Sequence, residues 1–353
     1  METNQPKIKA AILGATGMVG QRFVQLLSNH PWFEISALTG SDRSAGRKYS
    51  DACYWRQEGN MPDAVRDMQV LPAVPPVNAG VVFSALPADI AHDIEPEFAR
   101  AGYIVCSNSS AYRYEEDIPV MIPEINAGHL ALLDEQKKKR GWDGLIITSP
   151  NCTTSGAVFP LKVLNEIFGI EKIFLVSMQA VSGAGYPGLP YLAIADNVVP
   201  LIEGEEKKLE LEPRLLLGKM NGKERISAPM TISAQANRVA VSDGHTICLS
   251  VKLAKSASLE EVKAALISYA WPDEIKRLPS APQQPLVYRE EADRPQPRLD
   301  RNAGSGMAIS IGRLRPCPIL DFRLVAVVHN TLRGAASGSV LNAELLKAKG
   351  YFG

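Results

Sequence analysis

The chain has 353 residues, of which 46% are hydrophobic, and its formal net charge is +0. This length suffices for two domains with their own cores, and neutrality argues against nucleic acid or an anionic membrane as the main partner. The five scattered cysteines show no CxxC spacing, so neither a zinc site nor a disulfide framework is predicted. The N-terminus lacks the apolar core of a signal peptide, and no apolar run reaches membrane-spanning length. We therefore expect a protein of the reducing cytoplasm without a metal.

The N-terminal segment predicts a dinucleotide-binding turn. An apolar strand over 7–13 is followed by Gly14-Ala-Thr-Gly-Met-Val-Gly20 and by a helical pattern. Glycines in such a turn let a pyrophosphate approach the helix N-terminus. Because the spacing is GxxGxxG rather than GxGxxG, a turn that only packs the helix on the strand is the alternative. The predicted cofactor contacts are Gly14, Thr16, Gly17, Met18 and Val19.

The tip of the second predicted strand, 33–38, indicates which nicotinamide cofactor binds. An NAD site usually has an acidic residue here, whereas this tip reads Thr39-Gly-Ser-Asp-Arg-Ser44. Small hydroxyls with Arg43 suit a 2′-phosphate and favour NADP (NADPH), although Asp42 would suit a ribose hydroxyl. A solvated loop charge is the alternative for Arg43. The predicted contacts are Thr39, Ser41, Arg43 and Ser44.

Two further predicted strands, 81–87 and 103–107, end in small or polar residues, where open α/β sheets bind ligands. We expect Ser84 and Leu86 to contact the cofactor and Asn108 to contact the substrate. Arg113 follows in the same polar tip and is either an anion hook or a surface charge.

Cys152 is the candidate reactive group, in Ser149-Pro-Asn-Cys-Thr-Thr-Ser-Gly156. An apolar strand, 144–148, leads into this stretch, and an apolar helical pattern, 157–168, leads out of it. A thiol near a helix N-terminus ionises more readily, because unpaired N–H groups and the helix dipole favour an anion. A small buried cysteine that only packs there is the alternative.

After Cys152 the pattern changes. Strands are predicted over 173–180, 226–240, 246–254, 307–313 and 319–328, helices over 203–217, 257–269 and 337–347, and a Pro-rich surface loop over 282–297. The predicted fold class is α/β: a Rossmann-like, doubly wound parallel sheet over 1–150, then an α+β catalytic and dimerisation domain over 151–330 with a mostly antiparallel sheet. A closing segment, about 331–353, is expected to pack back on the first domain.

A nucleophilic thiol needs a proton-transfer partner, and histidine is the usual one near neutral pH. Of the five histidines, only His245 lies in a glycine turn between strands of the domain that follows Cys152. A lone histidine is more often structural than catalytic, so the pairing with Cys152 rests on resemblance as much as on placement.

Six motifs occur together in this order: Gly14-Ala-Thr-Gly-Met-Val-Gly20, Ser-Pro-Asn151-Cys152-Thr-Thr, Gln179-Ala-Val-Ser182-Gly-Ala-Gly, Glu205-x-x-Lys208, Asn237-Arg238-Val and Asp243-Gly-His245-Thr. Over nearly the full chain they resemble the aspartate-semialdehyde dehydrogenases, particularly their archaeal and fungal-like branch. One departure is Ala240, where the family commonly has proline. It affects a turn and no reacting group.

The resemblance implies NADPH-dependent reductive dephosphorylation of L-aspartyl-4-phosphate to L-aspartate 4-semialdehyde, in the pathway to lysine, threonine and methionine. It also implies a homodimer or homotetramer. By resemblance, Cys152 is the nucleophile, His245 the general acid/base, and Gln179 orients the acyl group. The remaining implied roles are Arg238 for the substrate carboxylate, Glu205 or another glutamate of 203–206 for its ammonium, Arg113 and Lys208 for the phosphate, and Ser182, Gly183 and Asn330 for the cofactor.

Three other functions stay open. N-acetyl-γ-glutamyl-phosphate reductase and malonyl-CoA reductase share the scaffold, but neither substrate offers a free ammonium beside a carboxylate for Glu205 and Arg238. A dinucleotide-sensing regulatory protein would not need Cys152, Gln179 and His245 together.

Overall fold

The structure, a computed structural model, describes residues 6–352. Most of the N-terminal segment that lacks a signal-peptide core lies outside these residues. The chain forms two compact units. Unit 1 comprises Met1–Met121, Gly128–Ser149 and Ala336–Gly353, and unit 2 comprises Ile122–Ala127 and Pro150–Ala335. Within the span predicted as the first domain, Ile122–Ala127 thus clusters with unit 2, and the chain returns to unit 1 from Ala336.

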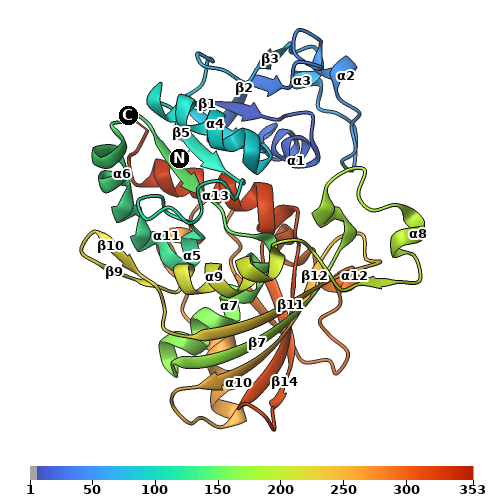
Figure 1. Cartoon of the computed structure of the whole chain (residues 1–353), viewed down its shortest axis with the longest axis vertical. Coiled ribbons are helices and arrows are strands. Elements are labelled where there is room, and N and C mark those ends of the chain that lie inside the picture. The colour runs from blue at the N-terminus through green and yellow to red at the C-terminus, as the bar shows by residue number, and fades with distance from the viewer. Residues whose placement is uncertain (1–5, 353) are drawn as a thin grey trace. The chain divides into compact units, whose positions relative to one another are not determined.

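Unit 1 is built on a six-stranded sheet in the order β3-β2-β1-β4-β5-β6, with every neighbouring pair parallel (Figure 1). Its strands are β1 (Ile8–Leu13), β2 (Phe33–Gly40), β3 (Val70–Pro72), β4 (Val81–Ser84), β5 (Ile104–Ser107) and β6 (Leu145–Thr148). The strand order reverses between β1 and β4, which makes their carboxyl ends the topological switch point where such sheets bind ligands. The Rossmann-like prediction is confirmed.

The helices of unit 1 include one from the far end of the chain. They are α1 (Met18–Leu27), α2 (Tyr49–Ala52), α3 (Asp63–Arg66), α4 (Ala88–Arg100), α6 (Leu132–Arg140) and α13 (Ser337–Ala348). α13 packs against β4, β5 and α1. A buried pair fastens it, because His30 Nε2 lies 2.8 Å from Glu344 Oε1. His30 Nδ1 accepts the backbone N–H groups of Trp32 and Phe33, so the neutral ring carries its proton on Nε2 and donates it to Glu344.

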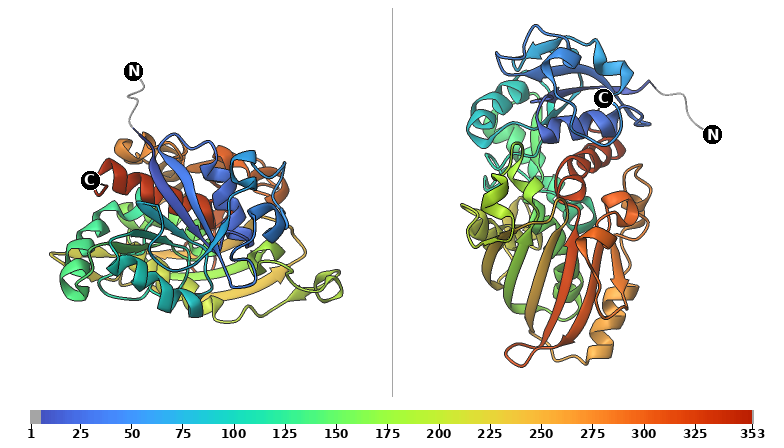
Figure 2. Two further views of the ribbon diagram at one scale, coloured as in Figure 1. Left: turned by 90° about the horizontal axis from the view of Figure 1, so that it is seen from above. Right: turned by 90° about the vertical axis from the view of Figure 1, so that its right-hand side faces the viewer.

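Unit 2 is built on a seven-stranded sheet in the order β13-β14-β15-β12-β7-β11-β8, and its strands lie side by side as one twisted sheet (Figure 2). Most neighbours are antiparallel, while β7–β11 and β13–β14 are parallel, so the prediction of a mostly antiparallel sheet is confirmed. The strands are β7 (Ile170–Gln179), β8 (Val198–Val199), β11 (Thr231–Val239), β12 (His245–Leu253), β13 (Leu286–Arg289), β14 (Ile309–Pro316) and β15 (Phe322–Val328); β9 (Lys219–Asn221) and β10 (Glu224–Ile226) form a separate hairpin.

Three local predictions for unit 2 were wrong. The Pro-rich segment 282–297 is not only a surface loop, because it contains β13, an edge strand that pairs with β14. The single strand predicted over 226–240 is two strands, since Pro229 lies between β10 and β11 and cannot donate to a sheet ladder. His245 does not lie in the turn but begins β12, where it pairs with Val328.

Three helices cover one face of the second sheet: α7 (Cys152–Ile167), α9 (Glu205–Leu216) and α10 (Leu259–Ser268). α7 packs on β12 and β15, α9 on β11, and α10 beside α7. At Gly156 an added Cβ would lie 2.7 Å from Val328 Cβ and 2.8 Å from Ile247 Cδ1, so only glycine lets the start of α7 approach the strands this closely. The shorter helices are α5 (Pro123–Asn126), α8 (Tyr191–Ile194), α11 (Asp273–Lys276) and α12 (Pro297–Asp300).

The opposite face of this sheet carries partly exposed apolar side chains. Burial alternates along β12, where Ile247 and Leu249 are buried whereas Cys248 and Ser250 are half-buried. On β7 the partner of Ser250 is Phe174, which is 47% exposed. This face also holds a surface hollow of about 370 Å³, lined by Lys172, Ile173, Phe174, Thr231, Ser233, Ser250, Cys317, Ile319 and Leu320.

Candidate active site

Cys152 is the first residue of α7, and Asn151 caps this helix. The Asn151 Oδ1 atom accepts the backbone N–H groups of Thr153, at 2.8 Å, and Thr154, at 3.2 Å. An asparagine cap of this kind satisfies donors that a helix start leaves unpaired. The thiol therefore lies at the positive end of a 16-residue helix, where a thiolate is stabilised.

His245 faces this thiol from the start of β12. Its Nε2 atom lies 3.2 Å from Cys152 Sγ, and its Nδ1 atom accepts the backbone N–H of Ala180 at 3.0 Å. Because an amide only donates, Nδ1 carries no proton, and the proton of the neutral ring lies on Nε2. Complete burial, followed by the charges of Arg238 and His329, lowers the pKa of His245 to about 3. At neutral pH, His245 thus presents an N–H donor to the sulfur.

Arg238, near the end of β11, brings a buried positive charge to the same place. Its Nη1 atom donates to the carbonyl oxygen of Ala180 at 2.8 Å. Burial lowers the pKa of its guanidinium, while Cys152 and Glu205 raise it. The turn at Gly183 lies directly against this group, because an added Cβ there would be 2.7 Å from Arg238 Nη1 and 3.2 Å from His245 Cε1. A side chain at position 183 would displace the predicted substrate ligand Arg238 and crowd the catalytic candidate His245.

Glu205, at the start of α9, is buried, and both of its carboxylate oxygens contact other side chains. Its Oε1 atom accepts from Asn151 Nδ2 at 2.8 Å and from Gln179 Nε2 at 3.0 Å, and its Oε2 atom lies 3.3 Å from Lys208 Nζ. The predicted ammonium ligand thus links the cap of α7 with the predicted acyl-orienting residue. Glu206 instead accepts the backbone N–H of Ala236 in β11.

Asn330 ties two turns of unit 2 together. Its Oδ1 atom accepts the backbone N–H of Gly244 at 2.9 Å, and its Nδ2 atom donates to Ser182 Oγ at 2.8 Å. Both ends of the amide are therefore bonded to the protein, and the residue is buried. The arrangement holds the Ser182 turn beside the turn that leads into His245.

Sequence reasoning missed the segment that follows Asn330. At Gly334 an added Cβ would lie 2.6 Å from Cys152 Cβ, so this backbone packs directly against the thiol-bearing residue. Its neighbour Arg333 makes two bonds of 2.7 Å to the carboxylate of Glu124 in α5. The guanidinium also lies 4.6 Å from the centroid of the Phe159 ring in α7. The Arg-Gly dipeptide carries no periodic signal, so the contact depends on tertiary structure.

In unit 1 the glycine turn lies at the switch point of the sheet. Gly14 has a φ of +72°, and an added Cβ would lie 3.1 Å from the carbonyl oxygen of Ala85, just after β4. Gly17 is the N-cap residue of α1 and has no side chain, so no side chain competes for the first N–H groups of the helix. These features fit a pyrophosphate. Thr16, Met18 and Val19 are half-buried in the same turn.

The end of β2 also fits the adenosine side of a dinucleotide. Thr39 is completely buried, and its Oγ1 atom has no hydrogen-bond partner among residues 6–352. Ser41, Asp42 and Arg43 follow it and are exposed. Ser44 is buried and donates to the carbonyl oxygen of Ser41 at 2.9 Å, which holds the tip folded.

The ends of β4 and β5 are bonded to each other beyond the sheet. Ser84 is buried, Leu86 is half-buried, and the N–H of Asn108 donates to the Ser84 carbonyl at 3.1 Å. Arg113 Nη2 donates to the Asn108 carbonyl at 2.7 Å. With an exposed fraction of 6%, Arg113 is not the surface charge that the sequence left open. Burial raises the pKa of the Glu95 carboxyl to about 7, although the charge of Arg113 acts in the opposite direction.

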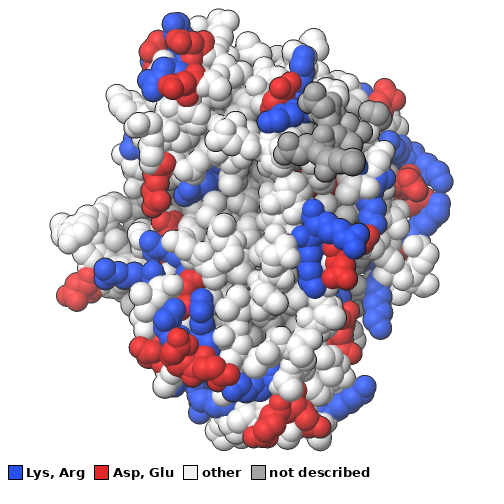
Figure 3. Space-filling view, turned by 180° about the vertical axis from the view of Figure 1, so that it is seen from behind, with Lys and Arg blue, Asp and Glu red and all other residues white. Residues whose placement is uncertain are grey.

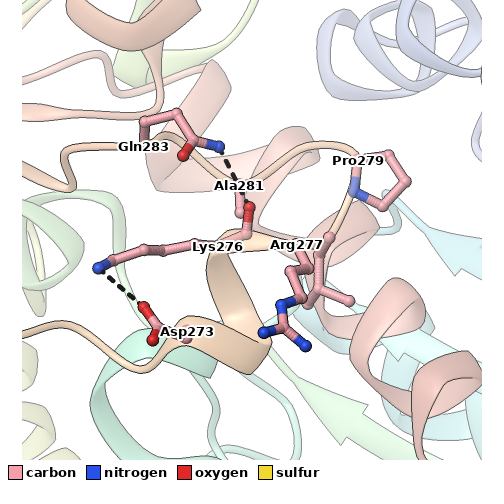
Figure 4. A pocket seen from close by; sticks show the side chains of 7 residues that line it. Asp273, Lys276, Arg277, Pro279, Ala281 and Gln283 are labelled. Atoms are coloured by element: carbon pink, nitrogen blue, oxygen red, sulfur yellow. Dashed lines mark hydrogen bonds and ion pairs between the residues drawn. The ribbon is translucent and has the colours of Figure 1, made fainter.

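A polar pocket of about 610 Å³ in unit 2 contains none of the predicted site residues. It is lined by α11 and the turn that follows, where Lys276 Nζ pairs with Asp273 and the Lys276 carbonyl accepts from Gln283 (Figure 4). Among residues 6–352, no three His, Cys, Asp or Glu side chains are grouped so that they could hold a metal ion.

Unit 1 has the parallel sheet of a dinucleotide-binding domain, and unit 2 carries a thiol at the N-terminus of a helix. Together these two features define the class of protein. Two family models match: "Semialdehyde dehydrogenase, NAD binding domain" over residues 9–133 and "Semialdehyde dehydrogenase, dimerisation domain" over residues 161–333. The class is therefore that of the semialdehyde dehydrogenases, which are oxidoreductases.

Individual relatives narrow the family. An aspartate-semialdehyde dehydrogenase of Archaeoglobus fulgidus is 50% identical over 341 residues, 96% of this chain and 98% of the relative. The Candida albicans enzyme, solved with NADP, superposes with a TM-score of 0.91 at 44% identity and covers 98% of this chain and 99% of its own. A Vibrio cholerae enzyme complexed with ASA gives 0.78 at 25% identity, over 99% of this chain and 100% of its own. The chain belongs to the aspartate-semialdehyde dehydrogenase family, which confirms the resemblance predicted from its motifs.

The buried neutral His245 should make stability fall at acidic pH. Its pKa is lowered from 6.5 to about 3 in the folded protein, so the unfolded chain binds the extra proton below pH 6.5. The stabilisation is complete above this pH and is lost between it and about pH 3, at about 1.4 kcal/mol per pH unit. From pH 8 to pH 5, wild type should therefore lose about 2 kcal/mol more than His245→Gln, measured by urea unfolding.

His92→Gln is the matched control, because this histidine is exposed. Its unfolding free energy should follow the wild-type pH dependence. Equal pH dependence of His245→Gln and wild type would show that folding does not lower the pKa of His245.

Proposed function

We propose that the chain catalyses the NADPH-dependent reductive dephosphorylation of L-aspartyl-4-phosphate to L-aspartate 4-semialdehyde, in the route to lysine, threonine and methionine. The observation that carries this proposal is the 3.2 Å contact between Cys152 Sγ and His245 Nε2 at the N-terminus of α7. The solved relatives with NADP and with ASA support the cofactor and the substrate. They do not favour the acyl-CoA, N-acetylglutamyl or sensor alternatives.

In the first half of the reaction, the Cys152 thiolate attacks the acyl carbon of the substrate. The carbon–sulfur bond forms, the bond to the phosphate oxygen breaks, and phosphate leaves with that electron pair. A thioester splits one difficult displacement into two easier steps. The His245 Nε2–H, 3.2 Å from the sulfur, and the buried Arg238 favour the thiolate over the thiol before the attack. The backbone N–H groups of Thr153 and Thr154 already donate to Asn151 Oδ1, so an oxyanion needs a donor outside this cap.

In the second half, the thioester becomes the aldehyde. When bound, NADPH supplies the hydride that this reduction requires. The Cys152 sulfur then leaves as a thiolate while the carbonyl re-forms, so no proton has to reach the sulfur. In place of the general acid/base role that the resemblance implied, we assign the neutral His245 as a hydrogen-bond donor in this step, because its Nδ1 atom is occupied by the Ala180 N–H. It stabilises the departing sulfur and the oxyanion that precedes the aldehyde.

For the substrate, we assign the groups of unit 2 by their charge and their bonds. Arg238 is buried and cationic and suits the substrate carboxylate, and Gln179 orients the acyl group. Lys208 is half-buried and contacts Glu205 at 3.3 Å, so a substrate ammonium can replace it on Glu205 while Lys208 turns to the phosphate. The phosphate role of Arg113, in unit 1, stays a prediction.

For the cofactor, we propose the turn of unit 1 that starts at Gly14 and the tip of β2. The 2′-phosphate is assigned to Ser41 and Arg43, which are exposed beside the buried Thr39 hydroxyl. Asn330 and Ser182 bond to each other in unit 2, and we retain them as candidates for the nicotinamide end.

We propose that the partly exposed sheet face of unit 2 pairs with a second copy of the chain. The family model names this region a dimerisation domain. Phe174 and Ile319 are 47% and 89% exposed there, and burial of such side chains stabilises association.

The surface charges of the chain and its cysteines also bear on its partners and its cellular location. Lys and Arg side chains alternate with Asp and Glu on the face drawn in Figure 3, as expected for a formal net charge of +0, and this favours a small-molecule partner over nucleic acid. Within residues 6–352, no helix has the length and apolar character needed to cross a membrane. We propose a cytoplasmic location, because the five cysteines are all free thiols.

The activity is tested in the oxidising direction with aspartate semialdehyde, NADP and inorganic phosphate. Wild type should form NADPH continuously only when phosphate is present, and Cys152→Ser should lose this activity while keeping its fold, because an alcohol is a far weaker nucleophile. Cys248→Ser is the control and should remain active. Wild-type turnover in Cys152→Ser would contradict the proposal, and dependence on coenzyme A instead of phosphate would favour an acyl-CoA reductase.

Arg43 is tested by comparing two exposed arginines of one loop. Arg43→Ala should raise the Michaelis constant for NADP by about 10–100-fold, the factor that corresponds to one lost charged hydrogen bond, and leave that for NAD nearly unchanged. Arg47→Ala is the matched control, since Arg47 bonds the Asp51 carbonyl instead. Equal Michaelis constants for NADP in wild type and Arg43→Ala would show that Arg43 is only a surface charge.

The dimer face is tested by Phe174→Glu, which places a charge among apolar groups that must lose water on association. Sedimentation velocity should show a dissociated chain, whereas wild type sediments as a dimer or larger. Val74→Glu, at an exposed valine of unit 1, should sediment as wild type does. A Phe174→Glu variant that remains fully associated would place the interface elsewhere.

A further inference from the structure

Glu212 is completely buried in unit 2, yet the proposed mechanism gives it no role. It follows Glu205 on α9 by about two helical turns, so both carboxylates lie on the same face of this helix. That face packs against α7. A buried carboxylate needs compensation by strong hydrogen bonds, so its partner is informative.

The partner is the residue that precedes the reactive thiol. Glu212 Oε2 accepts the backbone N–H of Asn151 at 2.6 Å, while Glu205 Oε1 accepts the side-chain amide of the same residue at 2.8 Å. The Asn151 Oδ1 atom caps α7, and its carbonyl accepts the N–H and the hydroxyl of Ser155. Two carboxylates therefore hold one asparagine from two directions.

We propose that Glu212 is a positioning residue that fixes the peptide before Cys152 and thereby sets the reactivity of the thiol. The Asn151 N–H lies outside α7 and has no helical partner, so without Glu212 it would be buried and unpaired. The strand-to-helix turn would relax to bond it elsewhere. Sγ would then leave its 3.2 Å contact with His245, and displacements of about 1 Å in such sites cost about 100-fold in rate.

The inference deepens the proposed function, since it concerns the same nucleophile, but its test needs neither substrate nor NADP. The measurement is the rate at which iodoacetamide alkylates Cys152, followed by peptide mass spectrometry between pH 5 and pH 9 on the full chain. Mass spectrometry separates Cys152 from the four other thiols. If Cys152 of wild type is alkylated rapidly but the protein does not oxidise the semialdehyde, the proposed function is wrong, while the positioning role of Glu212 remains supported.

Glu212→Leu removes the acceptor and should slow alkylation of Cys152 at neutral pH by about 10–100-fold, the factor that corresponds to one charged hydrogen bond. Glu212→Gln keeps an acceptor oxygen at the same reach and should restore the rate to within about threefold of wild type. The matched control is Glu210→Leu, because Glu210 lies on the same helix and accepts a backbone N–H at 3.1 Å, but from Ala234 in β11. It should alkylate as wild type does.

A structural role alone would lower the unfolding temperature of Glu212→Leu and of Glu210→Leu without separating their alkylation rates. Wild-type alkylation in Glu212→Leu, or an equal loss in Glu210→Leu, would therefore overturn the proposal. If Glu212→Leu does not fold, Glu212→Asp replaces it. The shorter side chain withdraws the acceptor and keeps the charge, so a wild-type alkylation rate in Glu212→Asp would overturn the proposal equally.

Discussion

The hydrogen bonds of Asn151 hold the start of α7, and the chemistry of unit 2 depends on them. The side-chain oxygen caps the helix, while the amide and the backbone N–H are held by Glu205 and Glu212. This fixes where the helix begins and aims its first residue, Cys152, at His245. Gly156 and Gly334 complete the placement, because a side chain at either position would push α7 or Cys152 away.

The electrostatics around this point favour one negative charge on sulfur. His245 is buried and neutral, with its donor aimed at Sγ, and Arg238 contributes a buried positive charge. Glu205 lies close by but is compensated by Lys208 and two amides. A thiolate therefore meets donors and a cation, and the neutral imidazole does not compete for its proton. Hydrogen-bond donors that are fixed in place before the reaction need no reorganisation during it.

The sequence predicted what local patterns encode. The glycine turn between β1 and α1, the strand-to-helix placement of Cys152 and the alternation along β12 are short-range signals, and each was found, although α7 begins five residues and β12 one residue before the predicted start. Edge strand β13 was missed because the segment around it is rich in proline. Its strand conformation depends on pairing with β14, which lies about 20 residues later in the chain and leaves no signal in the sequence of β13 itself. The tautomer of His245 could not be predicted from the sequence, because it is set by the backbone N–H of Ala180, which lies 65 residues away in the chain. Glu212 likewise reads as one more charge on a charged helix until its burial is seen.

We propose that Cys152 carries the acyl group, and a single turnover without phosphate tests this role most directly. Aspartate semialdehyde and NADP, mixed with the enzyme in phosphate-free buffer, should give a rapid burst of about one NADPH per active site and then stop, as expected when an acyl-enzyme accumulates. Mass spectrometry of the quenched enzyme should place the acyl group on the peptide that contains Cys152, and added phosphate should remove it. Continuous NADPH formation without phosphate, or a burst with no adduct on Cys152, would contradict the account.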